Sequence, residues 1–128
     1  MNIPRNVLFL DAAGGRNGAA AALMLGNMSG GAMRAFTADP SSWDAFADGT
    51  RPLDIVVTVS DSVVGEVCAV FWAGRPITTH WPLPDDPSVA QTVLADRIAA
   101  FVALPFSEIT PLELQARLDA IGRIPNGR

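Results

Sequence analysis

A short segment near the start of the chain combines an acid, glycines and a base in a pattern typical of anion-binding loops. The sequence NVLFLDAAGGRNGAAAALML, residues 6–25, predicts a strand, a glycine turn and a helix. Backbone N–H groups at the start of such a helix, together with Arg16, suit an oxyanion. Asp11 nevertheless places a carboxylate where the strand meets the turn. A negative charge therefore stands at the mouth of the expected anion pocket.

The common phosphate-binding loops do not fit this segment. A Walker loop needs a lysine, whereas all nine basic residues of the chain are arginines. The stretch GGRNG lacks the spacing of a dinucleotide fingerprint. An aspartyl-phosphate enzyme would want a second acid two residues after its nucleophile, where this chain has Ala13. Another type of loop must explain the pattern.

The elements that must position this loop alternate along the chain. Strands are expected within residues 5–10, 30–40, 54–60 and 74–83. Helices are expected at residues 17–27, at 41–49 behind a serine cap, around 63–67 behind Asp61, from an Asp86 cap to about Val102, and at 110–122 behind a Thr110 capping box. We predict one α/β domain over residues 1–128, with an open, mostly parallel four-stranded sheet and helices on both faces. Residues 11–18, 60–61 and 80–86 then converge beyond the carboxyl ends of the strands.

Composition limits the partners. Hydrophobic residues make up 49% of the chain, charged residues 17%, and the net charge is −4. The arginines are scattered, so we expect no nucleic acid as a partner. The apolar runs are too short for a bilayer and the start does not resemble an export signal, so we expect no membrane partner and a cytoplasmic location. The single cysteine, Cys68, excludes an internal disulfide, and the single histidine, His80, cannot build a metal site alone, so neither a metal nor a cofactor is expected.

Four stretches in the same order resemble the low-molecular-weight protein tyrosine phosphatase-like family, and within it the thiol-dependent arsenate reductases. VLFLD followed by AAGGRNGAAAALM is similar to the family's strand VLFLC, its Cys-x5-Arg loop and its Ala- and Met-rich helix. DIVVTVSDSVVGEVCAVFWAG (54–74) resembles DYVVTVCDNAAGEVCPVWPG, and THWPLPDDP (79–87) resembles HWGxPDP. RIAAFVALPFSEITPLELQARLDAIG (97–122) resembles the tail of proteobacterial members. The resemblance implies a shortened phosphatase-like fold.

The departures from the family concern its chemistry. Asp11 replaces the loop cysteine, the loop is one residue shorter, and Ser60 replaces the second cysteine, so that Cys68 alone remains. A helix-sized piece is also missing after residue 40, and the helix after Asp86 is shorter than usual. The family reaction needs a thiolate that attacks the oxyanion and a second thiol that releases the product. The resemblance assigns catalytic positions to Asp11, Arg16, Cys68 and Asp86, and anion-binding positions to Gly14, Gly15, Arg16, Asn17 and Gly18.

We predict that Asp11 acts as a built-in anion, which accepts hydrogen bonds from the loop amides and pairs with Arg16. The alternative is that Asp11 caps the turn or points to solvent while the loop collapses. Cys68 and the pair His80 and Trp81 are more simply packed side chains than functional groups, although His80 and Trp81 follow a strand and could line the pocket.

The leading functional hypothesis is a pseudo-enzyme that acts in binding or regulation. Its partners would be a phosphate- or arsenate-like anion, or a second copy of the chain that covers apolar surface left by the missing helix. The competing hypothesis is a surviving arsenate reductase or phosphatase, which uses Cys68 with an external thiol, or Asp11 as a base. A third hypothesis is a decayed paralogue with a stable fold and no ligand.

Overall fold

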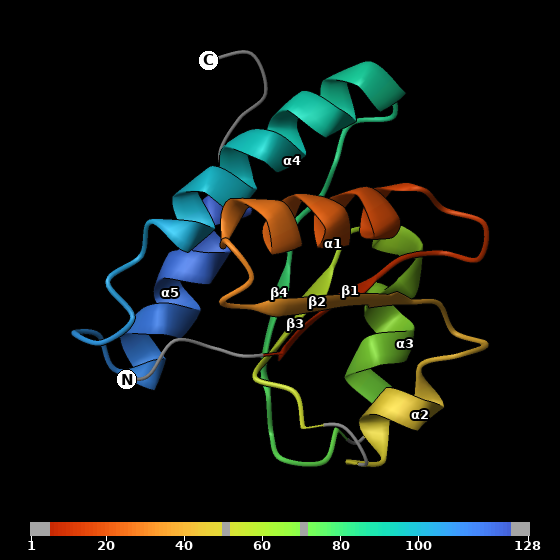
Figure 1. Ribbon diagram of the computed structural model, residues 1–128. Helices are drawn as coiled ribbons and strands as arrows, with labels where there is room; N and C mark the ends of the chain where they lie inside the picture. Colours follow the sequence, from red (N-terminus) through yellow and green to blue (C-terminus); the bar gives the residue numbers. More distant parts are fainter. Residues whose placement is uncertain (1–5, 50–51, 70–71, 124–128) are drawn as a thin grey trace.

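The computed structural model describes residues 6–49, 52–69 and 72–123, without the side chains of Cys68 and Ala69. The expected start of the first strand at Arg5 lies outside these residues. Strands and helices follow the alternating order that the sequence predicts (Figure 1). In chain order the elements are β1 (Asn6–Leu10), α1 (Asn17–Met28), β2 (Arg34–Ala38), α2 (Asp44–Ala47), β3 (Ile55–Thr58), the 3-10 turn η1 (Asp61–Val63), α3 (Val64–Ala69), β4 (Ile77–His80), α4 (Pro87–Val102) and α5 (Pro111–Ile121).

The four strands form one open parallel sheet in the order β2-β1-β3-β4. This confirms the predicted α/β fold class. β1 and β3 lie in the middle of the sheet, and their apolar side chains are buried on both faces. Continuous apolar runs are typical of such doubly covered parallel strands. All four strands end at one edge, where the following loops must meet.

Each face of the sheet has its own core, because successive side chains of a strand point to opposite sides. Val7 and Phe9 belong to a core with residues of α1, α4 and α5. Leu8 and Leu10 belong to a second core with residues of α2, η1 and α3. Figure 1 shows α1 and α4 on one side of the sheet and α2 and α3 on the other. Helices therefore cover both faces, as predicted.

Trp81 ties the edge strand β4 to the helical layer. It is fully buried, and its indole N–H donates to the Leu118 carbonyl of α5 at 3.1 Å. A Cβ atom at Gly122 would lie 2.6 Å from the His80 carbonyl oxygen and 2.8 Å from a Trp81 ring carbon. The glycine at the end of α5 thus permits a close approach to β4. Of the pair His80 and Trp81, which the sequence places after a strand, Trp81 is therefore a packing residue.

Helix caps decide how well the sequence predicts the boundaries. Asp86 accepts hydrogen bonds from the N–H groups of Ser88 and Val89, and Thr110 accepts one from the N–H of Glu113. Both caps stand where the sequence predicts them. The same local signals fix the bounds of α4 and α5.

Two other cap predictions are wrong. The N-cap of α2 is Trp43, without a side-chain bond, because Ser41 and Ser42 instead bond Asp39 in the preceding turn. The cap position before η1 is Ser60, and Asp61 lies inside the first turn with its carboxylate on His80. In both cases a competing polar partner takes the side chain that the sequence assigns to the cap.

Candidate functional site at the carboxyl ends of the strands

The loops after β1, β3 and β4 line a polar cavity of about 300 Å³ that is open to solvent. Its lining is rich in oxygen-bearing side chains and consists of Asp11, Asn17, Val59, Ser60, Asp61, Ser62, Leu83, Pro84 and Asp85. The structure thus brings together residues from all three predicted segments. The carboxylates in the lining outnumber its basic side chains, of which there is none among the described residues. Such a cavity disfavours anions.

Asp11 lies inside the loop that it precedes. Its side chain is buried, with 6% of the residue exposed. The Ala12 N–H donates to Oδ1 at 2.7 Å, and the Gly18 N–H donates to Oδ2 at 2.9 Å. Each carboxylate oxygen therefore accepts a backbone donor from the loop or from the first turn of α1. The carboxylate does not point to solvent.

Gly15 shows how closely the loop covers this carboxylate. A Cβ atom at Gly15 would lie 2.3 Å from Oδ1 of Asp11, which is far below any normal contact. Gly14 makes the preceding turn with a φ of 78°, in the region that favours glycine. The Gly15 N–H is bonded to the Ala12 carbonyl at 2.9 Å. The loop is therefore closed around a carboxylate, and its glycines allow that closure.

The predicted anion-binding residues do not line one common cavity. Asn17 lines the cavity described above, whereas Gly14 and Gly15 line a second, smaller one of about 180 Å³ on the β2 side of Asp11. The N–H of Gly18 is taken by Asp11. Two amides, those of Ala12 and Gly18, thus bind the protein's own side chain.

Arg16 does not take the position predicted for it. It is exposed at the N-cap position of α1 and lines neither of the two cavities. Within the described residues it makes no ion pair with Asp11. The predicted Asp11–Arg16 pair is therefore wrong. Two backbone amides already bind the carboxylate, and among the described residues no ion pair draws the guanidinium inward.

Asp86 has a structural role. Hydrogen bonds from Ser88, first its hydroxyl and then its N–H, lower the pKa of the Asp86 carboxyl. An aspartic acid with a lowered pKa is ionised at neutral pH and is a poor proton donor. The acid that lines the cavity is its neighbour Asp85. The residue that the sequence resemblance matches to a general acid is thus a helix cap in the structure.

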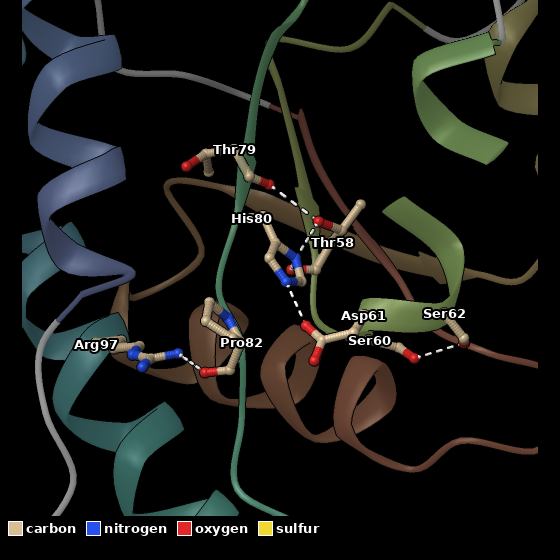
Figure 2. A network of polar contacts seen from close by, with 8 residues as sticks. All are labelled: Thr58, Ser60, Asp61, Ser62, Thr79, His80, Pro82 and Arg97. Atoms are coloured by element: carbon tan, nitrogen blue, oxygen red, sulfur yellow. Dashed lines mark hydrogen bonds and ion pairs between the residues drawn. The ribbon is translucent and has the colours of Figure 1, made fainter. Parts of the chain in front are cut away.

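His80 belongs to a polar group that the sequence reasoning missed (Figure 2). Its Nε2 lies 2.7 Å from Oδ1 of Asp61, and its Nδ1 lies 2.6 Å from the Thr58 hydroxyl. Thr58 and His80 are register partners across β3 and β4. No sequence motif marks this group. It could have been found only from the register of β3 with β4, which places Thr58 and His80 side by side.

Arg97 supports the loop that carries Asp85. This arginine of α4 is buried, and it donates from Nη1 to the Pro82 carbonyl at 2.6 Å, as Figure 2 shows. Burial lowers the pKa of its guanidinium. The side chain thereby ties the loop after β4, which contributes Leu83, Pro84 and Asp85 to the cavity, to α4. The sequence analysis did not single it out.

Cys68 can be placed only by its backbone, which belongs to α3; its side chain lies outside the described part of the chain. Among the described residues, no group of three His, Cys, Asp or Glu side chains is arranged to hold a metal ion. None of the described helices has the length and apolar character that a membrane crossing requires.

Comparison with known protein families gives no match, and neither the curated proteins nor the solved structures contain one. The functional argument for this chain therefore depends on its own residues and on the geometry of this site.

Proposed function

We propose that this chain is a degenerate protein of the tyrosine phosphatase and arsenate reductase type, which has lost the thiol chemistry and acts in binding or regulation. The observation that supports the proposal is the position of Asp11. Its carboxylate is buried and accepts the N–H groups of Ala12 and Gly18. These are donors that an oxyanion in such a loop would use. The side chain takes the place of the ligand.

Electrostatics strengthens this proposal. A second unit charge about 4 Å from an ionised Asp11 would be repelled by roughly 4 kcal/mol at an effective dielectric constant of about 20. Asp61 and Asp85 face the same cavity and add to the repulsion. Arg16, which would offset it, lies outside the cavity. The wild-type loop should therefore reject phosphate and arsenate.

Among the described residues that line the cavity, no side chain supplies the thiol that the family reaction uses as its nucleophile. A carboxylate cannot perform the thiol exchange of the family reaction, and Ser60 cannot replace the second thiol. The hydroxyl of Ser60 is bonded to that of Ser62 at 2.9 Å, with no base between them. The carboxylate of Asp11 is engaged by two backbone N–H groups, which hold it in the loop.

An activity assay tests the loss of chemistry. We expect no reduction of arsenate with thioredoxin or glutathione as the thiol donor, and no hydrolysis of an aryl phosphate, above the rate without protein. Turnover that Cys68→Ala abolishes would instead establish an enzyme that uses an external thiol. Turnover that Asp11→Asn abolishes would establish Asp11 as the base. Asp85→Asn, in the same cavity but outside the loop, is the matched control for both.

The surface of α1 supports a protein partner, and we propose a second copy of the chain. The twelve residues of α1 include no charged side chain, although Leu23 is 68% exposed and Met28 is 45% exposed. An exposed helix without charges is unusual on a monomer. Sedimentation should show a dimer that Leu23→Gln weakens and that Leu112→Gln, at a more exposed leucine on α5, leaves intact. A wild-type monomer at high concentration would contradict the dimer.

A further inference from the structure

The bonded group Thr58, His80 and Asp61 connects the buried end of the sheet to the wall of the cavity. Thr58 is buried at the end of β3, and His80 is its partner at the end of β4. Asp61 begins η1, and its side chain is 85% exposed. Ser60, Asp61 and Ser62 form the wall of the cavity on this side. Figure 2 shows the imidazole between the strand residue and the wall.

The hydrogen bonds define the tautomer of the neutral imidazole. An ionised carboxylate offers no proton, so the 2.7 Å contact with Asp61 requires a proton on Nε2. Nδ1 is then an acceptor, and the Thr58 hydroxyl at 2.6 Å is its donor. The neutral ring is therefore hydrogen-bonded on both sides.

The charged ring also finds partners without moving. With a proton on Nδ1, the ring can donate to the Thr58 carbonyl, which lies 3.2 Å away. The Thr58 hydroxyl then turns its proton to the Thr79 carbonyl at 3.4 Å. Rotation of one hydroxyl thus gives both ring nitrogens and the Thr58 hydroxyl a hydrogen-bond partner in either charge state. Histidine is the side chain that ordinarily changes charge between about pH 5 and pH 8.

We propose that Thr58, His80 and Asp61 form a proton-responsive latch that holds η1 against β4. In the neutral state the latch is a hydrogen bond from an imidazole to a carboxylate. Protonation turns the same contact into an ion pair between His80 and Asp61, which is stronger at unchanged geometry. The cavity wall at residues 60–62 is accordingly held more firmly on the acid side of neutrality. The latch is independent of the proposal for the Asp11 loop.

Of the described charged side chains around the His80 ring, Asp61 is the one that contacts it. Asp11 and Asp85 share the cavity with Asp61, but in the described part of the chain neither makes a hydrogen bond or ion pair with the imidazole. On the α5 side, Asp119 is bound by the side chains of Thr79 and Gln115. On the α4 side, Arg97 is directed to the Pro82 carbonyl. The response should therefore depend on one carboxylate.

The single histidine makes this inference directly testable by NMR on the full chain labelled with ¹⁵N. At the alkaline end, the imidazole should carry its proton on Nε2 and not on Nδ1. The N–H groups of Val63 and Val64, bonded to the Ser60 and Asp61 carbonyls, report on η1. After correction for intrinsic exchange, their protection should be roughly two- to fivefold higher at about pH 5 than at about pH 8, as expected for an exposed ion pair.

Asp61→Asn should abolish this pH dependence, whereas Asp85→Asn, the matched carboxylate of the same cavity, should keep it. The proposal is overturned by a neutral ring with its proton on Nδ1, by equal protection at both pH values, or by an equal loss in the two variants. A fold check by the remaining backbone amides accompanies each variant. None of these outcomes depends on anion binding or on the phosphatase-like assignment.

Discussion

Asp11 and Asp61 follow neighbouring parallel strands, line the same cavity and have the same chemical group, yet the structure treats them in opposite ways. Asp11 is 6% exposed, and backbone amides surround its carboxylate. The side chain of Asp61 is 85% exposed, and one imidazole contacts it. A position at the end of a strand brings an acid to the site, but the donors around it decide its role. The carboxylate of Asp11 is bound by the protein's own amides, the basis of our proposal that it replaces a ligand, whereas Asp61 is available to solvent.

The same substitution at both positions should separate the two roles, and the larger effect belongs to Asp11→Asn. Each oxygen of Asp11 faces a backbone N–H, so the new amide nitrogen must oppose a donor. We expect the free energy of unfolding to fall by about 2 kcal/mol, the usual size for a buried hydrogen bond to a charged group. Urea denaturation monitored by circular dichroism measures it. A loss below about 0.5 kcal/mol would show that the amides do not hold the carboxylate.

Gly15→Ala should sharpen the description of the closed loop. The new Cβ would overlap Oδ1 of Asp11, and we expect a loss of about 1–3 kcal/mol in the free energy of unfolding. In the background of Asp11→Ala the space is empty, so the same change should cost less than about 0.5 kcal/mol. Additive costs would contradict this contact. Gly26→Ala, in α1 with open space around the glycine, is the control and should stabilise by about 0.5–1 kcal/mol.

Asp61→Asn should cost less than about 1 kcal/mol of stability, because the ion pair is exposed and solvent screens it. The measurement is the same urea denaturation, at a pH where the imidazole is charged. The difference between the losses in unfolding free energy of Asp11→Asn and Asp61→Asn measures how much burial distinguishes the two carboxylates. Equal losses for the two variants would mean that burial does not distinguish these carboxylates.

Asp86 provides a pH-dependent prediction with the smallest effect. Hydrogen bonds from Ser88 lower the pKa of the Asp86 carboxyl below its ordinary value of 3.8. The ionised cap therefore stabilises α4 fully at pH values above 3.8. That stability is lost as the pH falls below 3.8 through the lowered value of the folded state. The midpoint of denaturation should therefore drop less on acidification in Asp86→Asn than in the wild type. Asp85→Asn should drop as the wild type does, and a parallel drop in all three proteins would contradict the role of the cap.

The fold was predictable because its signals are local. Apolar runs placed β1 and β3, and the caps Asp86 and Thr110 placed α4 and α5. The serine cap of α2 was wrong because Asp39 lies close enough in the chain to compete for those serines. Short-range competition of this kind is difficult to rank from sequence alone.

The site was predictable in its location and only partly in its contacts. The loop glycines and Asp11 indicated a carboxylate among amides, which the structure contains. The Asp61–His80 contact depends on the register of β3 with β4, which no local pattern reveals. Gly122 ended a helix in the sequence analysis, but its close approach to His80 and Trp81 is a tertiary requirement.

Calorimetric titration of phosphate and arsenate into the wild type and Asp11→Ser tests the central claim most directly, with Asp61→Asn as the control. The wild type and Asp61→Asn should give no binding heat, because the carboxylate of Asp11 already occupies the N–H groups of Ala12 and Gly18 and repels a second anion. Asp11→Ser frees the N–H groups of Ala12 and Gly18 and should gain measurable affinity. Equal, tight binding by the wild type and Asp11→Ser would contradict the account.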